Sequence, residues 1–534
     1  SGVSWILDQN FDCDSIVTHN DTHLSVTLFQ PFAGFPATLS YSVGSVINSE
    51  LCIENKDWTW SEEWECNDWI ANGPIGSGTG PFYLEEPFDN DRLSEGGGGV
   101  AHLLPNWLYW EDGDFNFNQI EVIEAYDWDE RNTLFSTYQI DMADVFIEQY
   151  CLNHTDPDSI ESLPGFNCEY VETFTTTLAA MKVDREDENG EYVLNHDCDE
   201  DGNADCNAMS IPDVRLAISY SFDYEWHRNE TYGGMLAPQF GPIPNGFLFD
   251  DTQYPVFSYN LSLAEEILED AGFIRQYDCD SLTESGEPTV VEENARDGDE
   301  CRLPNVLRII ANPNSNRQEM AFKLADDLGG IGVAANGTAL EWSDYLDANY
   351  DGTWDVKFSG WAPDYLDPDN YWTPFAASIW IGGDAYGTGY QNSELDEKIY
   401  DARIESNSST RWELYSDAFQ IWSDDPNMII VGQNNGIRLS HDYVELHPYS
   451  AIGSLHWFDI SKSQLIQIAL MLDQSGPISQ FAPGFSSASW IAVDYVNSMQ
   501  DEYRFVIVEY DTGCEGNIAA EAAQDVIDDG IGLV

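Results

Sequence analysis

The spacing of apolar residues changes along the chain near residue 211. Before it, strand-like segments such as Leu24–Leu28 and Gln119–Ile123 alternate with turn-rich stretches. After it, apolar residues recur at the intervals of an amphipathic helix, first in Val214–Tyr220 and then in Leu261–Ala271, where Gly272 ends the pattern. Helix and strand patterns then follow one another, which predicts an α/β protein.

Two lobes are predicted from this change of pattern. Residues 1–211 form the first lobe, residues 212–435 form a second lobe inserted into it, and residues 436–462 return to the first lobe and provide a linker. The elements predicted within the second lobe are the strands Val306–Ile310 and Asn427–Val431 and the helices Arg317–Leu328, Leu395–Ala402 and Arg411–Ser423.

A separate module is predicted from about residue 463 to residue 534. Its elements follow in the order strand, helix, strand and helix, over Gln464–Leu472, Gly484–Met499, Tyr503–Tyr510 and Ile518–Ile527. Strands joined through a helix are expected to pair in parallel.

The charge of the chain excludes some classes of partner. Its 534 residues include 96 Asp and Glu against 20 Lys and Arg, a formal net charge of −76. Phosphate groups are bound by clustered cations, so neither nucleic acid nor an anionic membrane surface is an expected partner. Such a surface suits high ionic strength, where salt screens its self-repulsion, as in a marine, halophilic or archaeal protein. No apolar run of about 18 residues is present, so no membrane span is expected.

Ten cysteines indicate an oxidising compartment outside the cytoplasm: extracellular, at the cell surface, or in a periplasm-like space. Eight of them lie in short local pairs around acidic loops, which predicts the disulfides Cys52–Cys66, Cys151–Cys168, Cys198–Cys206 and Cys279–Cys301. Cys13 and Cys514 are left over and are open to pairing outside this chain. Six glycosylation sequons fit the same compartment: Asn20, Asn153, Asn229, Asn260, Asn336 and Asn407.

An aromatic-rich segment around Asp364 is the main candidate for binding chemistry. Asp364 lies between Trp361 and Tyr365. A carboxylate between an indole and a phenol suits a cationic amine, because the carboxylate pairs with the charge and the rings cover the rest of the ligand. From the residues alone, the alternative is a buried strand followed by a proline turn, with Asp364 as a capping residue.

This segment resembles the ligand-cleft segment of the peptide/nickel (family 5, oligopeptide-binding) class of ABC-importer solute-binding proteins. The residues that match the family's pattern, in its order, are Glu341, Trp342, Tyr345, Leu346, Gly352, Trp354, Asp355, Val356, Gly360, Trp361, Asp364, Tyr365, Asp367 and Pro368. Further matches follow in the family's order over residues 21–32, 78–84, 106–110, 138–142, 213–223 and 263–273. The resemblance implies a two-lobed type II periplasmic-binding-protein fold of the oligopeptide-binding kind.

The same resemblance implies roles for single residues. In the family, the aspartate that matches Asp364 holds the free amino group of a peptide, and the tryptophans that match Trp342 and Trp361 line the cleft. Asn312, at the start of another matched segment, is a further ligand-binding candidate, and Tyr365 is included as the neighbour of Asp364.

The family's cleft arginines, which meet the carboxylate of the peptide in some members, have no match in this chain. The corresponding positions fall near Asn349 and Phe358. This argues against short free peptides and leaves longer peptides, amines or other cations open as ligands.

The C-terminal module resembles the opening of the type I, branched-chain amino-acid-type periplasmic binding proteins. Its matches from Ile466 onward include Gly476, Pro477, Gly484, Ala488, Asn497, Asp511, Thr512 and Ala522. We expect a partial, Rossmann-like type I module that stops where a third strand should begin and does not bind a ligand alone. We also expect that an N-terminal portion, with any signal or anchor, is missing, because residue 1 falls inside what resembles the first lobe.

One acidic loop has the D-x-D-x-D-G spacing of a calcium site, with Gly202 at the sharp turn and Cys198 and Cys206 around it. A bound Ca²⁺ and a solvated acidic loop are both open, since no Glu occupies the twelfth position. The candidate ligands are Asp197, Asp199, Asp201, Asn203 and Asp205. The similar spacing from Asp347 to Gly352 is better explained as a helix-to-strand turn.

Motifs of catalysis are absent, including H-E-x-x-H and G-x-S-x-G, so the chain is not expected to be an enzyme. The prediction is an extracytoplasmic solute-binding protein that captures peptides or related cationic solutes and delivers them to an ABC permease. The alternative is a structural surface-layer or filament subunit, built from binding-protein folds and capable of self-assembly.

Overall fold

The structure of the chain is a computed structural model. It describes residues 10–11, 13–20, 22–40, 78–85, 99–111, 115–125, 128–145, 149–152, 161–183, 185–186, 192–193, 208–247, 257–282, 289–378, 387–445, 457–500 and 503–532. Among the helices of these residues, none has the length and apolar character needed to cross a membrane. The chain divides into two compact units: unit 1 with residues 1–45, 171–436 and 451–453, and unit 2 with residues 46–170, 437–450 and 454–534.

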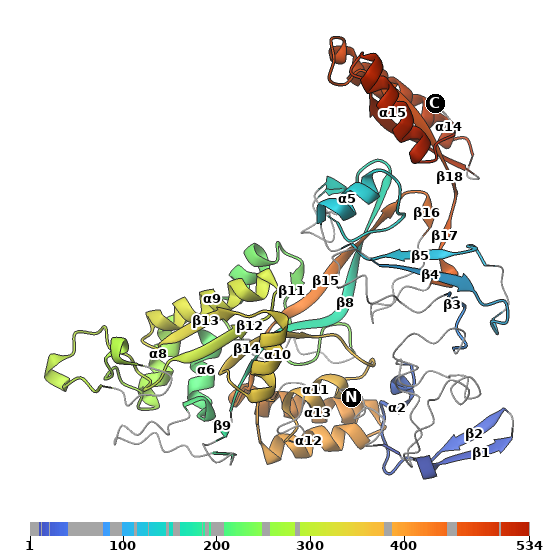
Figure 1. The fold of residues 1–534 in the computed structure, drawn as a ribbon. Helices are drawn as coiled ribbons and strands as arrows, with labels where there is room; N and C mark the ends of the chain where they lie inside the picture. Colours follow the sequence, from blue (N-terminus) through green and yellow to red (C-terminus); the bar gives the residue numbers. More distant parts are fainter. Residues whose placement is uncertain are drawn as a thin grey trace, which may run out of the picture. The chain divides into compact units, whose positions relative to one another are not determined.

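Unit 1 is built on a six-stranded mixed sheet (Figure 1). Its strands in spatial order are β11 (Leu236–Ala237), β15 (Met428–His441), β8 (Phe166–Met181), β14 (Val356–Trp361), β12 (Leu307–Ala311) and β13 (Ala335–Ala339). Strand β12 pairs in parallel with β13 and β14, whereas β14 pairs antiparallel with β8. Parallel neighbours need crossover connections, and helices α9 (Ser315–Gly330) and α10 (Trp342–Asp351) supply them.

Helices cover both faces of this sheet (Figure 1). One core forms between the sheet and α6 (Pro212–Tyr220), α8 (Leu261–Asp270) and α9, and the other between the sheet and α11 (Asp369–Ala376), α12 (Ser393–Ile404) and α13 (Ser408–Asp424). In β15, Ile429 and Val431 belong to the first core, and Met428 and Ile430 belong to the second. Because successive residues of a strand point to opposite faces, a strand covered on both sides is apolar without interruption.

Asparagine begins several of these helices. The side chains of Asn260, Asn314, Asn392 and Asn407 cap α8, α9, α12 and α13, and each accepts a hydrogen bond from a backbone N–H of the first turn. At its other end, α10 stops at Gly352, whose φ of 65° lies in the left-handed region that glycine adopts at low cost. The helix-to-strand turn expected near residues 347–352 is therefore confirmed.

Unit 2 has smaller sheets and its own core. Strands β3 (Phe82–Leu84), β4 (Val100–Pro105) and β5 (Ile120–Ile123) form an antiparallel sheet, and two hairpin-like pairs join β6 (Cys151–Leu152) to β7 (Glu161–Ser162) and β16 (Val444–Glu445) to β17 (Ser461–Lys462). The core contains Phe135 of α5 (Trp128–Ser136) and Leu439. The ring of Phe135 stacks on His441 with a centroid distance of 4.2 Å.

Residues 464–528 form a β-α-β-α module within unit 2, made of β18 (Gln464–Leu472), α14 (Ala482–Asn497), β19 (Tyr503–Asp511) and α15 (Gly516–Asp528). The strands pair in parallel from Gln464 opposite Tyr503 to Leu472 opposite Asp511, which confirms the predicted element order and pairing. An ion pair between Arg504 and Asp442 ties the module to the rest of unit 2.

The division between the units falls inside β8 and β15, after residues 170 and 436. The lobe boundary predicted near residue 211 lies within unit 1, just before α6. The apolar pattern changes there because the helices begin, whereas the unit is defined by β8, a central strand that precedes them. The described part of unit 1 also contains β1 (Ile16–Asn20), β2 (His23–Val26), α2 (Phe35–Thr38), β9 (Arg185–Glu186), β10 (Tyr192–Val193) and α7 (Tyr224–Trp226).

Two of the predicted disulfides lie among the described residues, and both are formed: Cys151–Cys168 and Cys279–Cys301. The pairs Cys52–Cys66 and Cys198–Cys206 lie outside the described residues and stay predictions. Cys514 is exposed and unpaired.

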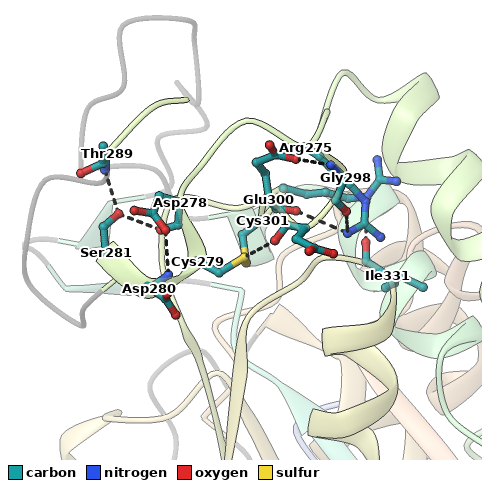
Figure 2. The surroundings of a disulfide bond; sticks show 12 residues. Arg275, Asp278, Cys279, Asp280, Ser281, Thr289, Gly298, Glu300, Cys301 and Ile331 are labelled. Carbon is teal, nitrogen blue, oxygen red and sulfur yellow. Dashed lines mark hydrogen bonds between the residues drawn. A yellow bond between two sulfur atoms is a disulfide. The ribbon is translucent and has the colours of Figure 1, made fainter. Parts of the chain in front are cut away.

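The Cys279–Cys301 disulfide closes a loop with a sequence separation of 22 residues, and local hydrogen bonds hold both ends (Figure 2). Ser281 Oγ accepts from the backbone N–H of Thr289 at 3.1 Å. Near the other end, Glu300 Oε2 accepts from the backbone N–H of Gly298 at 2.9 Å. Hydrogen bonds therefore hold the described part of the loop close to both cysteines.

Replacing both Cys279 and Cys301 by serine is expected to lower the free energy of unfolding by about 3 kcal/mol, because the unfolded chain regains the entropy of the opened loop. Urea unfolding followed by circular dichroism measures this change. The matched control is Cys514→Ser, which alters an unpaired thiol and leaves the midpoint unchanged. Equal midpoints for the double variant and the unaltered chain would contradict the prediction.

Candidate functional site

Two of the predicted binding residues of unit 1 lie at the carboxyl ends of the parallel strands β12 and β14. Asn312 follows the last residue of β12, and Trp361 is the last residue of β14. In open α/β sheets, ligands bind in crevices outside the carboxyl ends of the strands. The topology therefore favours this edge of the sheet as a site.

A buried asparagine joins Trp361 to Asp364. Asn370, in the first turn of α11, is fully buried. Its Oδ1 accepts from Trp361 Nε1 at 2.9 Å and from the backbone N–H of Asp364 at 3.0 Å, and its Nδ2 donates to Asp364 Oδ2 at 3.3 Å. One amide thus fixes the indole and the carboxylate relative to each other, while both side chains remain half-buried.

Tyr365 lies in the interior, with 1% of its surface exposed. Its hydroxyl donates to Asp369 Oδ2 at 2.8 Å, and its ring meets the edge of Phe32. Burial, and then the negative charge of Asp369, raises the pKa of Tyr365 well above its ordinary value, so the hydroxyl remains a donor. Tyr365 therefore packs beneath the Asp364 loop and supports it.

Two buried carboxylates after Asp364 are paired with arginines from two different helices. Arg411 of α13 donates from Nη1 and Nη2 to the two oxygens of Asp367 at 2.8 and 2.6 Å. Burial raises the pKa of Asp367 above its ordinary value, and the hydrogen bonds from Arg411 oppose that rise. Arg403 Nη1 of α12 lies 3.7 Å from Asp369 Oδ2. Both pairs fasten the start of α11 to the helices beneath it.

Arg403 also connects this region to the N-terminal segment of unit 1. Its Nη2 donates to Asn10 Oδ1 at 3.2 Å, and its carbonyl accepts from the backbone N–H of Ala33 at 3.1 Å. Its guanidinium lies 4.5 Å from the centroid of the Phe32 ring. The Asp364 loop is thus supported by segments nearly 400 residues apart in the sequence, since Asn10 and Arg403 differ by 393 positions.

Trp342 presents its ring to solvent at the start of α10, with 55% of its surface exposed. It stacks on Tyr345 with a centroid distance of 5.7 Å and an interplanar angle of 17°. Tyr345 is buried, and its hydroxyl donates to the carbonyl oxygen of Phe358 in β14 at 2.9 Å. The exposed indole therefore has a rigid base.

Asn312 is a neighbour of Arg317, a residue that no motif indicated. Arg317 Nη1 lies 3.4 Å from Asn312 Oδ1, and Asn314 Oδ1 accepts from the backbone N–H of Arg317 at 3.0 Å. The guanidinium covers Gly360, because a Cβ at that position would lie 2.3 Å from Nη2. The structure therefore places a cation beside Trp361 that a search for the family's arginine positions does not find.

The positions near which the family's cleft arginines would fall hold neutral side chains. Phe358 is fully buried, and Asn349 Oδ1 accepts a hydrogen bond from Lys357 Nζ. Lys357 is itself buried, and its Nζ lies 4.6 Å from the centroid of the Trp354 ring. Burial, and then the charge of Lys182, lowers the pKa of Lys357 to about 7.

The calcium-loop candidate from Asp197 to Asp205 lies outside the described residues and stays a prediction. Within the residues that are described, no group of three or more His, Cys, Asp or Glu side chains could hold a metal ion. Five of the predicted glycosylation sites are exposed, Asn20, Asn229, Asn260, Asn336 and Asn407, whereas Asn153 lies outside the described residues.

Comparison with known families gives the assignment. Residues 4–382 match the model described as "Bacterial extracellular solute-binding proteins, family 5 Middle". The chain belongs to family 5 of the bacterial extracellular solute-binding proteins. Members of family 5 are binding proteins rather than enzymes, and the family predicted from the sequence is confirmed.

The curated relatives of this family 5 protein cover it to different extents. It is 23% identical over 432 residues to the probable D,D-dipeptide-binding periplasmic protein DdpA of Escherichia coli (strain K12), which covers 80% of this chain and 69% of that protein. It is 25% identical over 248 residues to heme-binding protein A of Haemophilus influenzae, covering 46% of this chain and 41% of that protein. The chain therefore spans less than half the length of this second relative.

Solved structures confirm the two-lobed α/β fold of periplasmic binding proteins. The DppA protein from Helicobacter pylori in complex with peptide STSA has a TM-score of 0.61 at 18% identity, covering 84% of this chain and 74% of that chain. NikZ from Campylobacter jejuni in complex with Ni(L-His) has a TM-score of 0.62 at 16% identity, covering 86% of this chain and 80% of that chain.

Arg411→Met in this family 5 protein is expected to lower the free energy of unfolding by about 3–5 kcal/mol, because it leaves the buried carboxylate of Asp367 without its partner. Chemical unfolding measures the loss. Adding Asp367→Asn to the same chain removes the orphaned charge and should restore part of the stability. Lys398→Met is the matched control, since it breaks the exposed pair with Asp417 and should leave stability unchanged. Equal losses for the two single variants would refute this role for the buried pair.

Lys357→Met is expected to flatten the rise of stability between pH 7 and pH 10. The folded pKa of Lys357 lies at about 7, below the unfolded value, so the unfolded chain binds the extra proton across this window. Stability therefore rises with pH there, by up to about 1.4 kcal/mol per pH unit for one proton. Unfolding free energies of variant and unaltered chain, measured at several pH values, isolate this contribution. Parallel curves for the two chains would show that Lys357 does not titrate in this way.

Proposed function

We propose that this family 5 protein captures peptides or related cationic solutes outside the cytoplasm and delivers them to an ABC permease. The observation that carries the proposal is the shared bonding of Trp361 and Asp364 to Asn370 at the carboxyl edge of the sheet. A carboxylate and an indole held at fixed positions form a pre-organised receptor for an ammonium group.

In this mechanism the amino group of a ligand pairs with Asp364, and Trp361 lies beside it. The exposed ring of Trp342, held by Tyr345, offers a flat apolar surface for the rest of the ligand. Aromatic rings bind side chains of many shapes, so a receptor of this kind selects the amine more strongly than the sequence of a peptide.

The printed names of relatives support a peptide ligand without fixing its length. DdpA of Escherichia coli is named as a probable D,D-dipeptide-binding protein, and AppA of Bacillus subtilis was solved with a nonapeptide, with a TM-score of 0.58. The heme and nickel ligands named for other relatives keep a wider class of solutes within the proposal.

A location outside the cytoplasm agrees with the two disulfides and with periplasmic relatives. Glycans on the exposed sequons and Ca²⁺ in the loop from Asp197 to Asp205 belong to the same proposal. Intact-protein mass spectrometry, with and without a chelator, tests both, since a protein of bare sequence mass would exclude glycans and bound calcium together.

We also infer that the C-terminal module is the start of a type I binding domain. Parallel pairing of β18 and β19 supports this inference. At the carboxyl end of β19, hydrogen bonds from Ser475, Gly513 and Gln474 lower the pKa of Asp511 to about 2 and order the two loops beyond the strands. A crystal structure tests the inference: a further parallel strand paired beside β18 would support it, and a free or antiparallel-paired edge of β18 would contradict it.

A structural surface-layer or filament subunit is the second candidate. It is favoured by the apolar side chains that α14 exposes, among them Phe485, Ile491 and Tyr495, which suit contacts with another copy. Native mass spectrometry of the protein as isolated separates the two functions. A peptide-sized mass lost on denaturation supports transport, whereas an empty protein present only as large oligomers supports assembly.

Asp364→Asn is expected to weaken binding of peptides with a free amino group by about 10- to 100-fold, because a charge-assisted hydrogen bond is lost. N-acetylated versions of the same peptides should bind both chains equally weakly. Isothermal titration calorimetry measures the affinities. The control Asp344→Asn removes an exposed carboxylate from α10 and should change nothing. If acetylated and free peptides bind the unaltered chain equally well, Asp364 does not bind the amino group of the peptide.

A further inference from the structure

We propose that Arg317 forms a second, anionic subsite that binds a carboxylate of the ligand, foremost the terminal carboxylate of a peptide. The inference rests on the proposed function of peptide capture and narrows the ligand to a zwitterion. It also assigns the carboxylate to a residue of α9, at a position different from those near Asn349 and Phe358.

Among the residues that the structure describes, the immediate surroundings of the Arg317 guanidinium are neutral. Within the described residues, its hydrogen-bond contact through Nη1 is to Asn312 at 3.4 Å, and its Nε is buried with no acceptor. Its positive charge acts on Tyr232 and Tyr345, where burial raises the pKa of each hydroxyl and Arg317 opposes that rise. A buried donor left without an acceptor is costly unless a ligand supplies one.

The lack of a carboxylate partner is unusual in this chain. Carboxylates outnumber cations by 96 to 20, so an acidic partner is available for nearly any arginine. The buried Arg215 and Arg403 and the partly buried Arg411 do meet one, in Asp425, Asp369 and Asp367. Arg317 lies in the first turn of α9, at the candidate site. Within the described residues, no carboxylate lies within ion-pair distance of its guanidinium.

The position of Arg317 is set by two features of the backbone around it. Asn314 caps α9 through the backbone N–H of Arg317, which fixes where the side chain leaves the helix. Gly360 in β14 then gives the guanidinium room to lie over the strand, directly before Trp361. The guanidinium therefore lies over Gly360, the residue before Trp361, at the strand end that carries the proposed amine receptor.

Gly360 offers a variant that moves this cation without removing it. A methyl group at position 360 would lie 2.3 Å from Nη2 and 3.4 Å from Cζ of Arg317, which are the far end of a flexible side chain, and 3.3 Å from the backbone carbonyl oxygen of Thr176. Gly360→Ala should therefore displace the guanidinium at small cost to the fold. Gly360→Ala thus tests the position of the guanidinium, whereas Arg317→Met tests its charge.

The experiment compares a synthetic set of alanine- and leucine-containing di-, tri- and tetrapeptides, each made as the free acid and as the C-terminal amide. Calorimetric affinities are measured for the unaltered chain and for Arg317→Met, Arg317→Lys and Gly360→Ala, with thermal unfolding as the check of folding. The unaltered chain should prefer the free acids by about 10- to 100-fold. Arg317→Met and Gly360→Ala should lose this preference with amide binding unchanged, and Arg317→Lys should keep part of it.

The outcomes separate this inference from the function on which it rests. Equal binding of acids and amides by the unaltered chain would overturn the subsite and leave peptide capture standing. If Arg317→Met weakened the binding of acids and amides equally, the subsite would also be overturned, because Arg317 would then have a structural role. Failure of the unaltered chain to bind either form, with no peptide carried through purification, would overturn the proposed function and the subsite together.

Discussion

The buried, bidentate pair of Asp367 and Arg411 is the interaction on which the candidate site most depends. Asp367 follows the Asp364 loop and precedes α11, so its two hydrogen bonds to α13 set where that helix begins. Asn370, which bonds both Trp361 and Asp364, lies in the first turn of the same helix. The geometry of the candidate receptor is therefore set by the packing beneath it.

The few basic side chains of this protein have different structural roles. Some are buried against carboxylates and hold elements together, as Arg411 and Arg403 do, and Lys357 is buried beside an amide and an indole ring. Arg317 differs from these because the described structure supplies its guanidinium with neutral neighbours. In a protein with a net charge of −76, long-range attraction favours cations near the surface generally, so selection of a zwitterion requires a local cation at the site.

Periodic features were predictable from the sequence, and tertiary ones were not. Strand β18 has the predicted bounds, and α6 and α8 begin within two residues of theirs, because each reflects a regular pattern of apolar positions. The long strand β8 was not identified, since its burial changes from half-exposed to complete along its length and gives no single period.

The candidate site shows the same division. Asp364, Trp361 and Trp342 were found through a sequence motif, whereas Asn370 and Arg317 were not, because their roles arise only from contacts made in the folded chain. The predicted partner Tyr365 lies in the interior, since the turn after Trp361 directs it toward Asp369. A motif indicates which segment forms a site, but the side-chain directions depend on the packing beneath.

The central place of β8 has a consequence for how the chain is made. Its neighbours in the sheet, β14 and β15, begin at residues 356 and 428, far beyond its own end at residue 181. At a synthesis rate of about 5–20 residues per second, β8 waits on the order of ten seconds or more for a partner. Such non-local pairing folds slowly, so the main sheet forms late. Export machinery would therefore meet a chain whose largest sheet is not yet assembled.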